Sequence, residues 1–146
     1  MDFHHILVPV DMSEHARAAL GAAADLARAT GARLHLLHAH GLSEAEFRYL
    51  RYMSEGIERE VAQTSRRELE QWAERFAPDG VETELHTSAL EPREAILAAA
   101  DEVGADLIAM GTHGRSGLKR MLMGSVTEFV VRSAPCPVLT VRASGG

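Results

Sequence analysis

The first forty or so residues constrain the fold most strongly. A nearly continuous apolar run from Phe3 to Val10 is typical of a strand that is covered on both faces of a sheet. Ser13 can cap the amphipathic helix that follows, and Gly31 can end it. A second strand is predicted over residues 33–39. Because a strand, a helix and a strand in this order form a parallel right-handed crossover, the chain is expected to build an α/β sheet.

The middle of the chain continues this alternation. Residues 43–76 have helical periodicity, and Gly56 is expected to divide them into two helices. Residues 81–87 alternate between apolar and polar side chains, as a half-exposed edge strand does. Pro92 fits the first turn of another helix, with Gly104 after its last turn. Its predicted core positions are Ile96, Leu97, Ala100 and Val103.

The last third predicts two more strands and a helix. An apolar strand covers residues 107–110, and the pattern Ser125-x-x-Glu128 is a capping box for a helix whose apolar residues are Val126, Phe129 and Val130. A fifth strand is predicted over residues 135–141, at an edge because of its prolines. The predicted fold class is α/β: a single doubly wound open sheet of five parallel strands with helices on both faces. One domain is expected over residues 1–146, with 142–146 as a disordered tail.

Composition excludes several functional classes. The net charge is −6, and the 15 Lys and Arg residues are interspersed among 21 Asp and Glu residues, so no nucleic-acid-binding stripe is predicted. No apolar run has membrane-spanning length, and no leader pattern opens the chain, so we expect a cytoplasmic protein. The single cysteine, Cys136, cannot form an internal disulfide and is expected to be buried in the last strand.

A glycine-rich stretch, residues 111–125, lies between the predicted fourth strand and the last helix. Glycines let a backbone approach a ligand closely, and the first turn of a helix offers unpaired N–H groups to an anion. The stretch matches neither the Walker A pattern nor G-x-G-x-x-G. Spaced glycines are also ordinary turn residues, so the local pattern leaves phosphate binding and a plain turn both open.

Several motifs taken together resemble one family. The spacing Gly111-x2-Gly114-x9-Gly124-Ser125 is similar to the nucleotide-binding pattern of the ATP-binding branch of the universal stress protein family. Residues 6–11, 36–39, 110–114 and 135–139 look like other landmarks of that family, so the resemblance runs from about residue 3 to 142. It implies the strand order 3-2-1-4-5.

The resemblance also implies a site. Gly111 and Gly114 would let the loop follow the ribose and phosphates, and the N–H groups after residue 123 would bind the phosphates. The Ala39 backbone would contact adenine, and Asp11 would accept from a ribose hydroxyl or help to hold Mg²⁺ with the phosphates. The implied nucleotide-binding residues are Pro9, Val10, Asp11, Ala39, Met110, Gly111, His113, Gly114, Arg115, Ser116, Gly117, Gly124, Ser125 and Val126.

Two features limit what the resemblance carries over. Arg115, Lys119 and Arg120 can either reach phosphate or form a solvated face. Leu90 occupies a position where the family often has glycine, which puts the loop after the third strand in question. Residues 43–76 correspond to a variable part of the family, so no role is assigned to them.

The histidines suggest a metal site less strongly than their number implies. On a strand, His38 and His40 share one face and His35 points to the other, so these three cannot converge without a bend. No metal ligand set is therefore predicted from the protein, apart from Asp11 toward a phosphate-bound Mg²⁺. Spacing alone also gives no nucleophile with a base and an orienting partner, so no catalytic residue is predicted.

These observations support a leading hypothesis and two alternatives. The first is an ATP-binding universal stress protein that acts as a nucleotide-dependent regulator of a stress response. The alternatives are a weak ATPase or phosphotransferase that uses the same site, and an interaction module that binds AMP or cyclic AMP. The resemblance further implies a homodimer formed through Val138, Leu139 and Val141 of the last strand, which would cover an exposed sheet edge.

Overall fold

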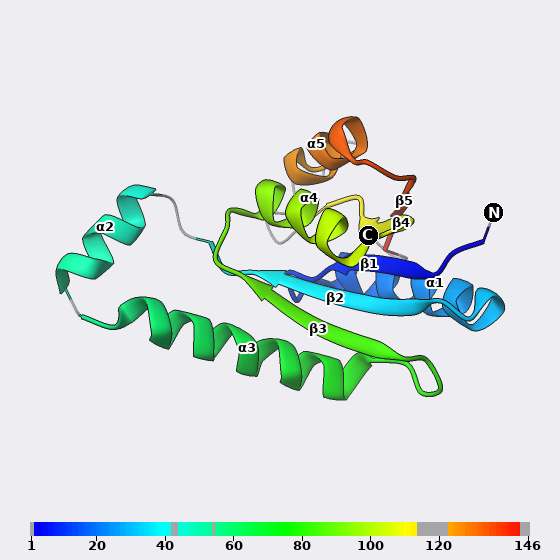
Figure 1. The fold of residues 1–146 in the computed structure, drawn as a ribbon, viewed down its shortest axis with the longest axis horizontal. Coiled ribbons are helices and arrows are strands. Elements are labelled where there is room, and N and C mark those ends of the chain that lie inside the picture. The colour runs from blue at the N-terminus through cyan, green and yellow to red at the C-terminus, as the bar shows by residue number, and fades with distance from the viewer. Residues whose placement is uncertain (1, 42–43, 54, 114–122, 144–146) are drawn as a thin grey trace.

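The computed structural model describes residues 2–41, 44–53, 55–113 and 123–143. Strands and helices alternate through most of the chain, as Figure 1 shows. The elements are β1 (His5–Pro9), α1 (Glu14–Thr30), β2 (Arg33–Ala39), α2 (Glu44–Met53), α3 (Ile57–Phe76), β3 (Thr83–Ser88), α4 (Pro92–Val103), β4 (Leu107–Gly111), α5 (Ser125–Ser133) and β5 (Val138–Val141).

All five strands pair in parallel in the order β3-β2-β1-β4-β5. This confirms the predicted fold class and strand order. The chain moves from β1 outward to β3, then returns to β4 on the other side of β1. The carboxyl ends of β1 and β4 therefore diverge into a crevice, where open α/β sheets bind their ligands.

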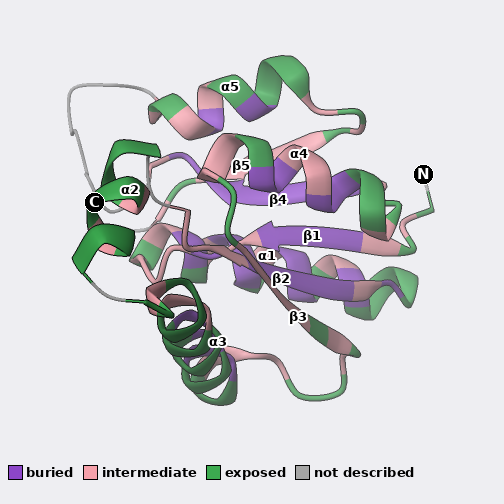
Figure 2. Cartoon of the chain, turned by 60° about the vertical axis from the view of Figure 1, so that its left-hand side comes forward, coloured by how far each residue is buried: buried purple, intermediate pink, exposed green. Residues whose placement is uncertain are grey.

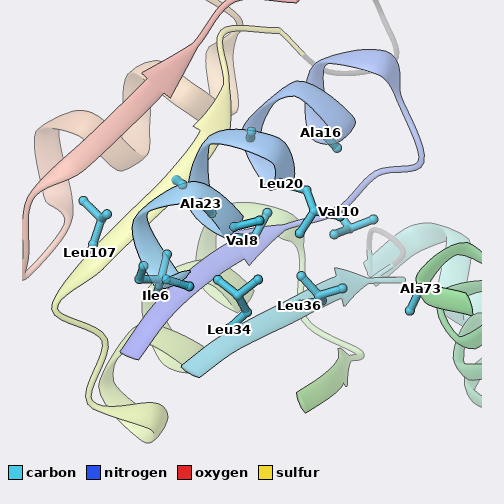
Figure 3. Packing of buried hydrophobic residues seen from close by; sticks show 14 of the residues in the cluster. Ile6, Val8, Val10, Ala16, Leu20, Ala23, Leu34, Leu36, Ala73 and Leu107 are labelled. Atoms are coloured by element: carbon cyan, nitrogen blue, oxygen red, sulfur yellow. The ribbon is translucent and has the colours of Figure 1, made fainter. Parts of the chain in front are cut away.

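Helices cover both faces of the sheet, with one core cluster under each layer. On one face, α1 packs its small residues onto β1, β2 and β4, and Figure 3 shows Ala16, Leu20 and Ala23 above Ile6 and Leu34. On the other face, Leu7, Leu37 and Ile108 pack against buried residues of α4 and α5. Both faces of β1, β2 and β4 are consequently buried (Figure 2), which explains their continuous apolar runs.

Several local predictions are confirmed. The Ser13 hydroxyl accepts a hydrogen bond from the Ala16 N–H at 3.2 Å and caps α1. Gly31 ends α1 with φ of 77°, a left-handed conformation that glycine adopts without strain. Gly56, with φ of 82°, separates α2 from α3, as predicted. Ser43, the first residue of the predicted helical region, lies outside the described residues.

The start of α5 differs from the prediction. Gly124 is the N-cap, and Ser125 is the first helical residue, so the predicted capping box does not form. Glu128 instead pairs with Arg132 at 2.7 Å, one turn farther along the helix. Thr127 is buried in place of Phe129, which is 37% exposed, because α5 is an outer helix that packs through a narrow stripe.

Two further expectations need correction. β5 begins at Val138, so Cys136 precedes the strand and is only half-buried, although burial still raises the pKa of its thiol. The edge position predicted from the prolines is confirmed. In α4, Ile96 and Ala100 are buried as expected. Their buried neighbours are Ala95 and Ala99, whereas the predicted Leu97 and Val103 are half-buried, so α4 packs closely through alanines.

α2 differs from the other helices because none of its residues is buried. Tyr49, Tyr52 and Met53 are 65%, 89% and 65% exposed, and Figure 1 shows the helix standing out beyond the sheet. None of the described helices is long and apolar enough to cross a membrane.

Candidate functional site

A cavity of about 330 Å³ opens at the carboxyl ends of β1 and β4, where the strand order reverses. Every predicted nucleotide-binding residue within the described part of the chain lines it. These residues are Pro9, Val10, Asp11, Ala39, Met110, Gly111, His113, Gly124, Ser125 and Val126. The remaining predicted residues, Gly114, Arg115, Ser116 and Gly117, lie outside the described residues. This cavity is called the crevice below.

The crevice has an apolar inner part that the sequence motifs only partly indicated. Leu37, Pro92 and Ile96 line it in addition to the predicted residues, together with Ala16 and Thr127. Pro92 and Ile96 belong to the first two turns of α4, which begins beside the crevice. The sequence predicted Ile96 as a core position and Pro92 as part of the first turn, but only the strand order shows that this side of α4 reaches the site. The inner part therefore suits a flat apolar group.

The amino terminus of α5 forms the opposite, polar side of the crevice. No side chain among the described residues caps this helix, and the N–H groups of Ser125, Val126 and Thr127 precede any intrahelical acceptor. The Gly124 N–H, which was expected to bind phosphate, instead donates to the Thr112 carbonyl at 2.6 Å. The donors available to an anion are consequently those that follow Gly124, where the positive end of the helix dipole also lies.

A buried hydrogen bond fixes α5 against the sheet. The Thr127 hydroxyl donates to the Gly111 carbonyl at 2.8 Å, and both residues are buried. This bond joins the end of β4 to the first turn of α5. Breaking it would leave a buried carbonyl without a donor, which lowers the stability of the fold. The distance between the strand end and the helix amino terminus is thus set inside the protein, before any ligand arrives.

The turn after β1 places a carboxylate in the crevice. Asp11 Oδ1 accepts a hydrogen bond from the Ser13 N–H at 3.0 Å, and the intervening Met12 has φ of 66°, which is strained for a side chain of its kind. The Val10 carbonyl accepts from His38 Nδ1 at 2.8 Å. These bonds hold the turn in one conformation and direct Asp11 toward the cavity that it lines.

Gly111 has a packing role that the motif did not indicate. A Cβ atom on Gly111 would lie 2.5 Å from the His15 Cβ and 2.8 Å from its backbone carbonyl. The end of β4 therefore needs glycine so that the first turn of α1 can approach. Nearby, the His113 ring lies 5.5 Å from the His15 ring, and His113 Nδ1 is 3.1 Å from the Thr112 hydroxyl.

Leu90 affects a different part of the molecule. Leu90 is 45% exposed, and it lines a groove between β3 and α4 instead of the crevice. Its backbone packs against Gly41, where a side chain would overlap the Leu90 carbonyl. The departure from the family pattern thus lies in the contact between the loops that follow β2 and β3.

The two histidines of β2, His35 and His38, point to opposite faces of the sheet, as predicted, and His40 follows the end of the strand. His38 contacts the Val10 carbonyl beside the crevice, and burial lowers the pKa of His40. His35 instead contacts His5 of β1 and His86 of β3 at 3.0 and 2.9 Å. Burial, followed by the charge of His86, lowers the pKa of His35. Sequence reasoning compared histidines along one strand and missed His86, whose partner depends on the register between strands.

The comparisons with known proteins agree with this geometry. The model of the universal stress protein family matches residues 2–142. Universal stress protein YxiE of Bacillus subtilis is 36% identical over 96% of this chain and 99% of its own length. The chain therefore belongs to the universal stress protein family.

Solved structures of relatives have the same fold. The structure of MJ0577 from Methanocaldococcus jannaschii covers 100% of both chains with a TM-score of 0.80 and 27% identity. A universal stress protein in complex with cAMP has a TM-score of 0.65 and 26% identity, covering 99% of this chain and 100% of its own. The Archaeoglobus fulgidus protein in complex with dAMP has the same TM-score and identity, covering 97% and 99%.

Proposed function

We propose that this universal stress protein binds an adenine nucleotide, with ATP as the first candidate, in the crevice, and that the bound nucleotide regulates a stress response. The observation that carries the proposal is that one cavity combines an apolar inner part with a helix amino terminus that no side chain among the described residues caps. A nucleotide has a flat apolar base at one end and an anion at the other. The crevice has complementary surfaces in the same arrangement.

The described residues divide between these two surfaces. Val10, Leu37 and Met110 can pack against a purine, and the Ala39 backbone at the end of β2 can recognise its edge. The N–H groups of Ser125 and Val126 can donate to phosphate oxygens. Asp11 also lines the crevice, and its carboxylate can accept a hydrogen bond from a ribose hydroxyl. Each part of the nucleotide thus has a chemically matched partner on a fixed element.

The relatives support an adenine nucleotide but do not determine how many phosphate groups it carries. The ligands in two of the related structures, cAMP and dAMP, each have an adenine base and one phosphate. Monophosphates need only the amino terminus of α5, whereas ATP extends farther and gains from a divalent ion. Asp11 supplies a carboxylate oxygen, the ligand type that Mg²⁺ prefers, so it fits a phosphate-bound ion. AMP and cyclic AMP are therefore the alternatives within this proposal.

Calorimetry with ATP, AMP, cyclic AMP and GTP tests the proposal on protein stripped of co-purified nucleotide. We expect adenine nucleotides to bind more tightly than GTP, with ATP the tightest in the presence of Mg²⁺. No binding of any nucleotide at about 1 mM, which corresponds to roughly −4 kcal/mol, would overturn it.

The Asp11→Asn variant distinguishes the two proposed roles of the carboxylate, which are Mg²⁺ binding and contact with the ribose. If Asp11 helps to hold Mg²⁺, this variant should weaken MgATP more than AMP, whereas a ribose contact should weaken both equally. Asp25→Asn is the matched control, because Asp25 is an exposed α1 residue whose side chain is 82% accessible. Multiple-turnover release of phosphate from ATP, measured on the same samples, separates a regulator from a weak ATPase.

A homodimer through β5 forms part of the proposal. β5 is an edge strand whose Val138, Leu139 and Val141 are only half-buried, and an edge with apolar side chains is covered favourably by a second copy. Light scattering of the wild type should give a dimer mass. A wild-type monomer at about 100 μM would contradict this part alone, because dimers of standard interface size associate far below that concentration.

A further inference from the structure

Three polar side chains converge on the α4 face of the β2–β3 edge, away from the crevice. They are His35 of β2 and Glu84 and His86 of β3. The parallel register pairs His35 with Glu84 and Leu37 with His86, and this places all three side chains on the face of the sheet that carries Leu37. Together with His5, which contacts His35, they are called the histidine cluster below.

The separations between the ligand atoms match a single bound ion. His35 Nδ1 lies 2.9 Å from His86 Nε2 and 3.3 Å from Glu84 Oε2, and the latter two atoms are 3.8 Å apart. Three atoms with these separations lie on a circle with a radius of about 2.0 Å, and Zn²⁺ bonds to histidine nitrogen and carboxylate oxygen are about 2.0–2.2 Å long. An ion close to the centre of this triangle would be at bonding distance from all three.

The surrounding groups orient these ligands. His35 Nε2 lies 3.0 Å from His5 Nδ1, so the nitrogen that does not face the triangle can donate its proton to His5. Glu84 Oε1 lies 3.4 Å from an Arg33 Nη1, which leaves Oε2 free for an ion. Metal-binding histidines and carboxylates are commonly held by such outer partners, which fix the tautomer and the direction of the lone pair.

An ion can also reach the cluster. The His35 side chain is 3% exposed, whereas those of Glu84 and His86 are 47% and 30% exposed. His86 lines the groove between β3 and α4, which Glu102 lines as well. An ion would therefore have two ligands at the surface and one inside, with its fourth position open to the groove.

We propose that the histidine cluster binds one transition-metal ion of the Zn²⁺ class through His35 Nδ1, His86 Nε2 and Glu84 Oε2, with water in the fourth position. Two imidazoles and a carboxylate favour Zn²⁺ and its neighbours over Mg²⁺ or Ca²⁺, which prefer all-oxygen sites. Binding displaces the proton shared between the two nitrogens. The site uses none of the residues of the crevice, so metal binding can be tested independently of nucleotide binding.

Calorimetry with ZnCl₂ and MgCl₂ on untagged, chelator-treated protein tests this site. We expect one Zn²⁺ per chain and no response to Mg²⁺. His86→Ala and Glu84→Gln should each weaken Zn²⁺ binding by more than about 100-fold, and His5→Ala by about 10-fold, as expected for a partner that only orients a ligand. The matched controls are His4→Ala and Glu82→Gln, which remove an exposed histidine and a neighbouring carboxylate that pairs with Arg33.

A nitrogen-specific measurement makes the result independent of folding defects in the variants. In long-range ¹H–¹⁵N spectra of the wild type with Zn²⁺, His35 should be metal-bound at Nδ1 and protonated at Nε2, whereas His86 should be metal-bound at Nε2. No Zn²⁺ binding by the folded wild type up to about 100 μM, about −5.5 kcal/mol, would overturn the proposal. Binding that folded His86→Ala and Glu84→Gln retain at full strength would overturn it equally.

Discussion

The crevice and the histidine cluster lie on the same sheet but are built in different ways. The crevice is lined largely by apolar side chains, glycines and backbone groups at the carboxyl ends of β1 and β4. The histidine cluster uses the side chains of β1, β2 and β3, and its geometry depends on which residues lie opposite one another. The first site follows from the topology of the fold, whereas the second follows from strand register.

This difference determines how each site responds to mutation. A backbone-lined site is damaged when a new side chain fills it or when its supporting elements move. A side-chain site is damaged when a single ligand atom is removed. A variant at one site should therefore change the binding of one ligand and leave the binding of the other unchanged.

The largest effect is expected from Gly124→Val. Gly124 lines the crevice directly before the first N–H groups of α5, which no side chain in the described ranges caps, so a branched side chain there should occupy the proposed phosphate position. We expect nucleotide affinity to fall at least about 100-fold, or roughly 2.7 kcal/mol, with Zn²⁺ binding unchanged. Calorimetry with each ligand measures both. The control is Gly21→Val, at an exposed position of α1 with no heavy atom near the added Cβ. Equal nucleotide affinities in the two variants would contradict the phosphate position.

A smaller effect, on stability, is expected from Gly111→Ala. The added Cβ would collide with His15, and overpacking of this kind costs about 1–3 kcal/mol. Urea unfolding of nucleotide-free protein should show this loss, whereas Gly21→Ala should stabilise α1 by about 0.5–1 kcal/mol. If Gly111→Ala leaves the nucleotide-free protein as stable as the wild type, the glycine serves the ligand and not the packing of α1.

Thr127→Val should lower the free energy of unfolding by about 1–3 kcal/mol, toward the lower end of this range, because it leaves the buried Gly111 carbonyl without its donor. Valine preserves the shape of threonine, so the nucleotide affinity should decrease only several-fold as α5 loosens. Thr30→Val is the control, since the Thr30 hydroxyl donates to the Leu26 carbonyl at an exposed helix end. Equal unfolding free energies for the two variants would show that the bond does not fix α5.

The smallest effect is expected for the coupling between the sites. Because the two sites share no residues, the stability increments from Zn²⁺ and from nucleotide should add within about 0.3–0.5 kcal/mol. Thermal unfolding with each ligand and with both gives the coupling. A larger value would mean that β2, which contributes Leu37 to one site and His35 to the other, transmits a change between them.

Sequence patterns predicted the fold and most of the crevice because these depend on short-range signals. Buried strands, Gly31 and Pro92 mark the elements, and the fold then places the ends of β1 and β4 together. The hydrogen bond from the Gly124 N–H to the Thr112 carbonyl was not predicted, because no short sequence pattern indicates a contact between residues twelve positions apart.

Register was the part that sequence patterns could not supply. Alternation shows that His35 and His86 each point to one side of a strand, but not that both point to the same side of the sheet or lie at the same level. Their pairing depends on a crossover through α2 and α3, and no short motif records its length. The same reasoning explains why the wall formed by α4 was recognised as core but not as part of the crevice.

The contact between Gly111 and His15 affects how the glycine motif can be used to sort relatives into ligand-binding and ligand-free groups. A descendant chain that no longer binds nucleotide would still need glycine at this position for as long as α1 packs against β4. The presence of that glycine is therefore evidence for the inherited scaffold. Residues that line the crevice but are exposed, such as Ser125 at the start of α5, have no such packing role and should be the first to change once a ligand is lost.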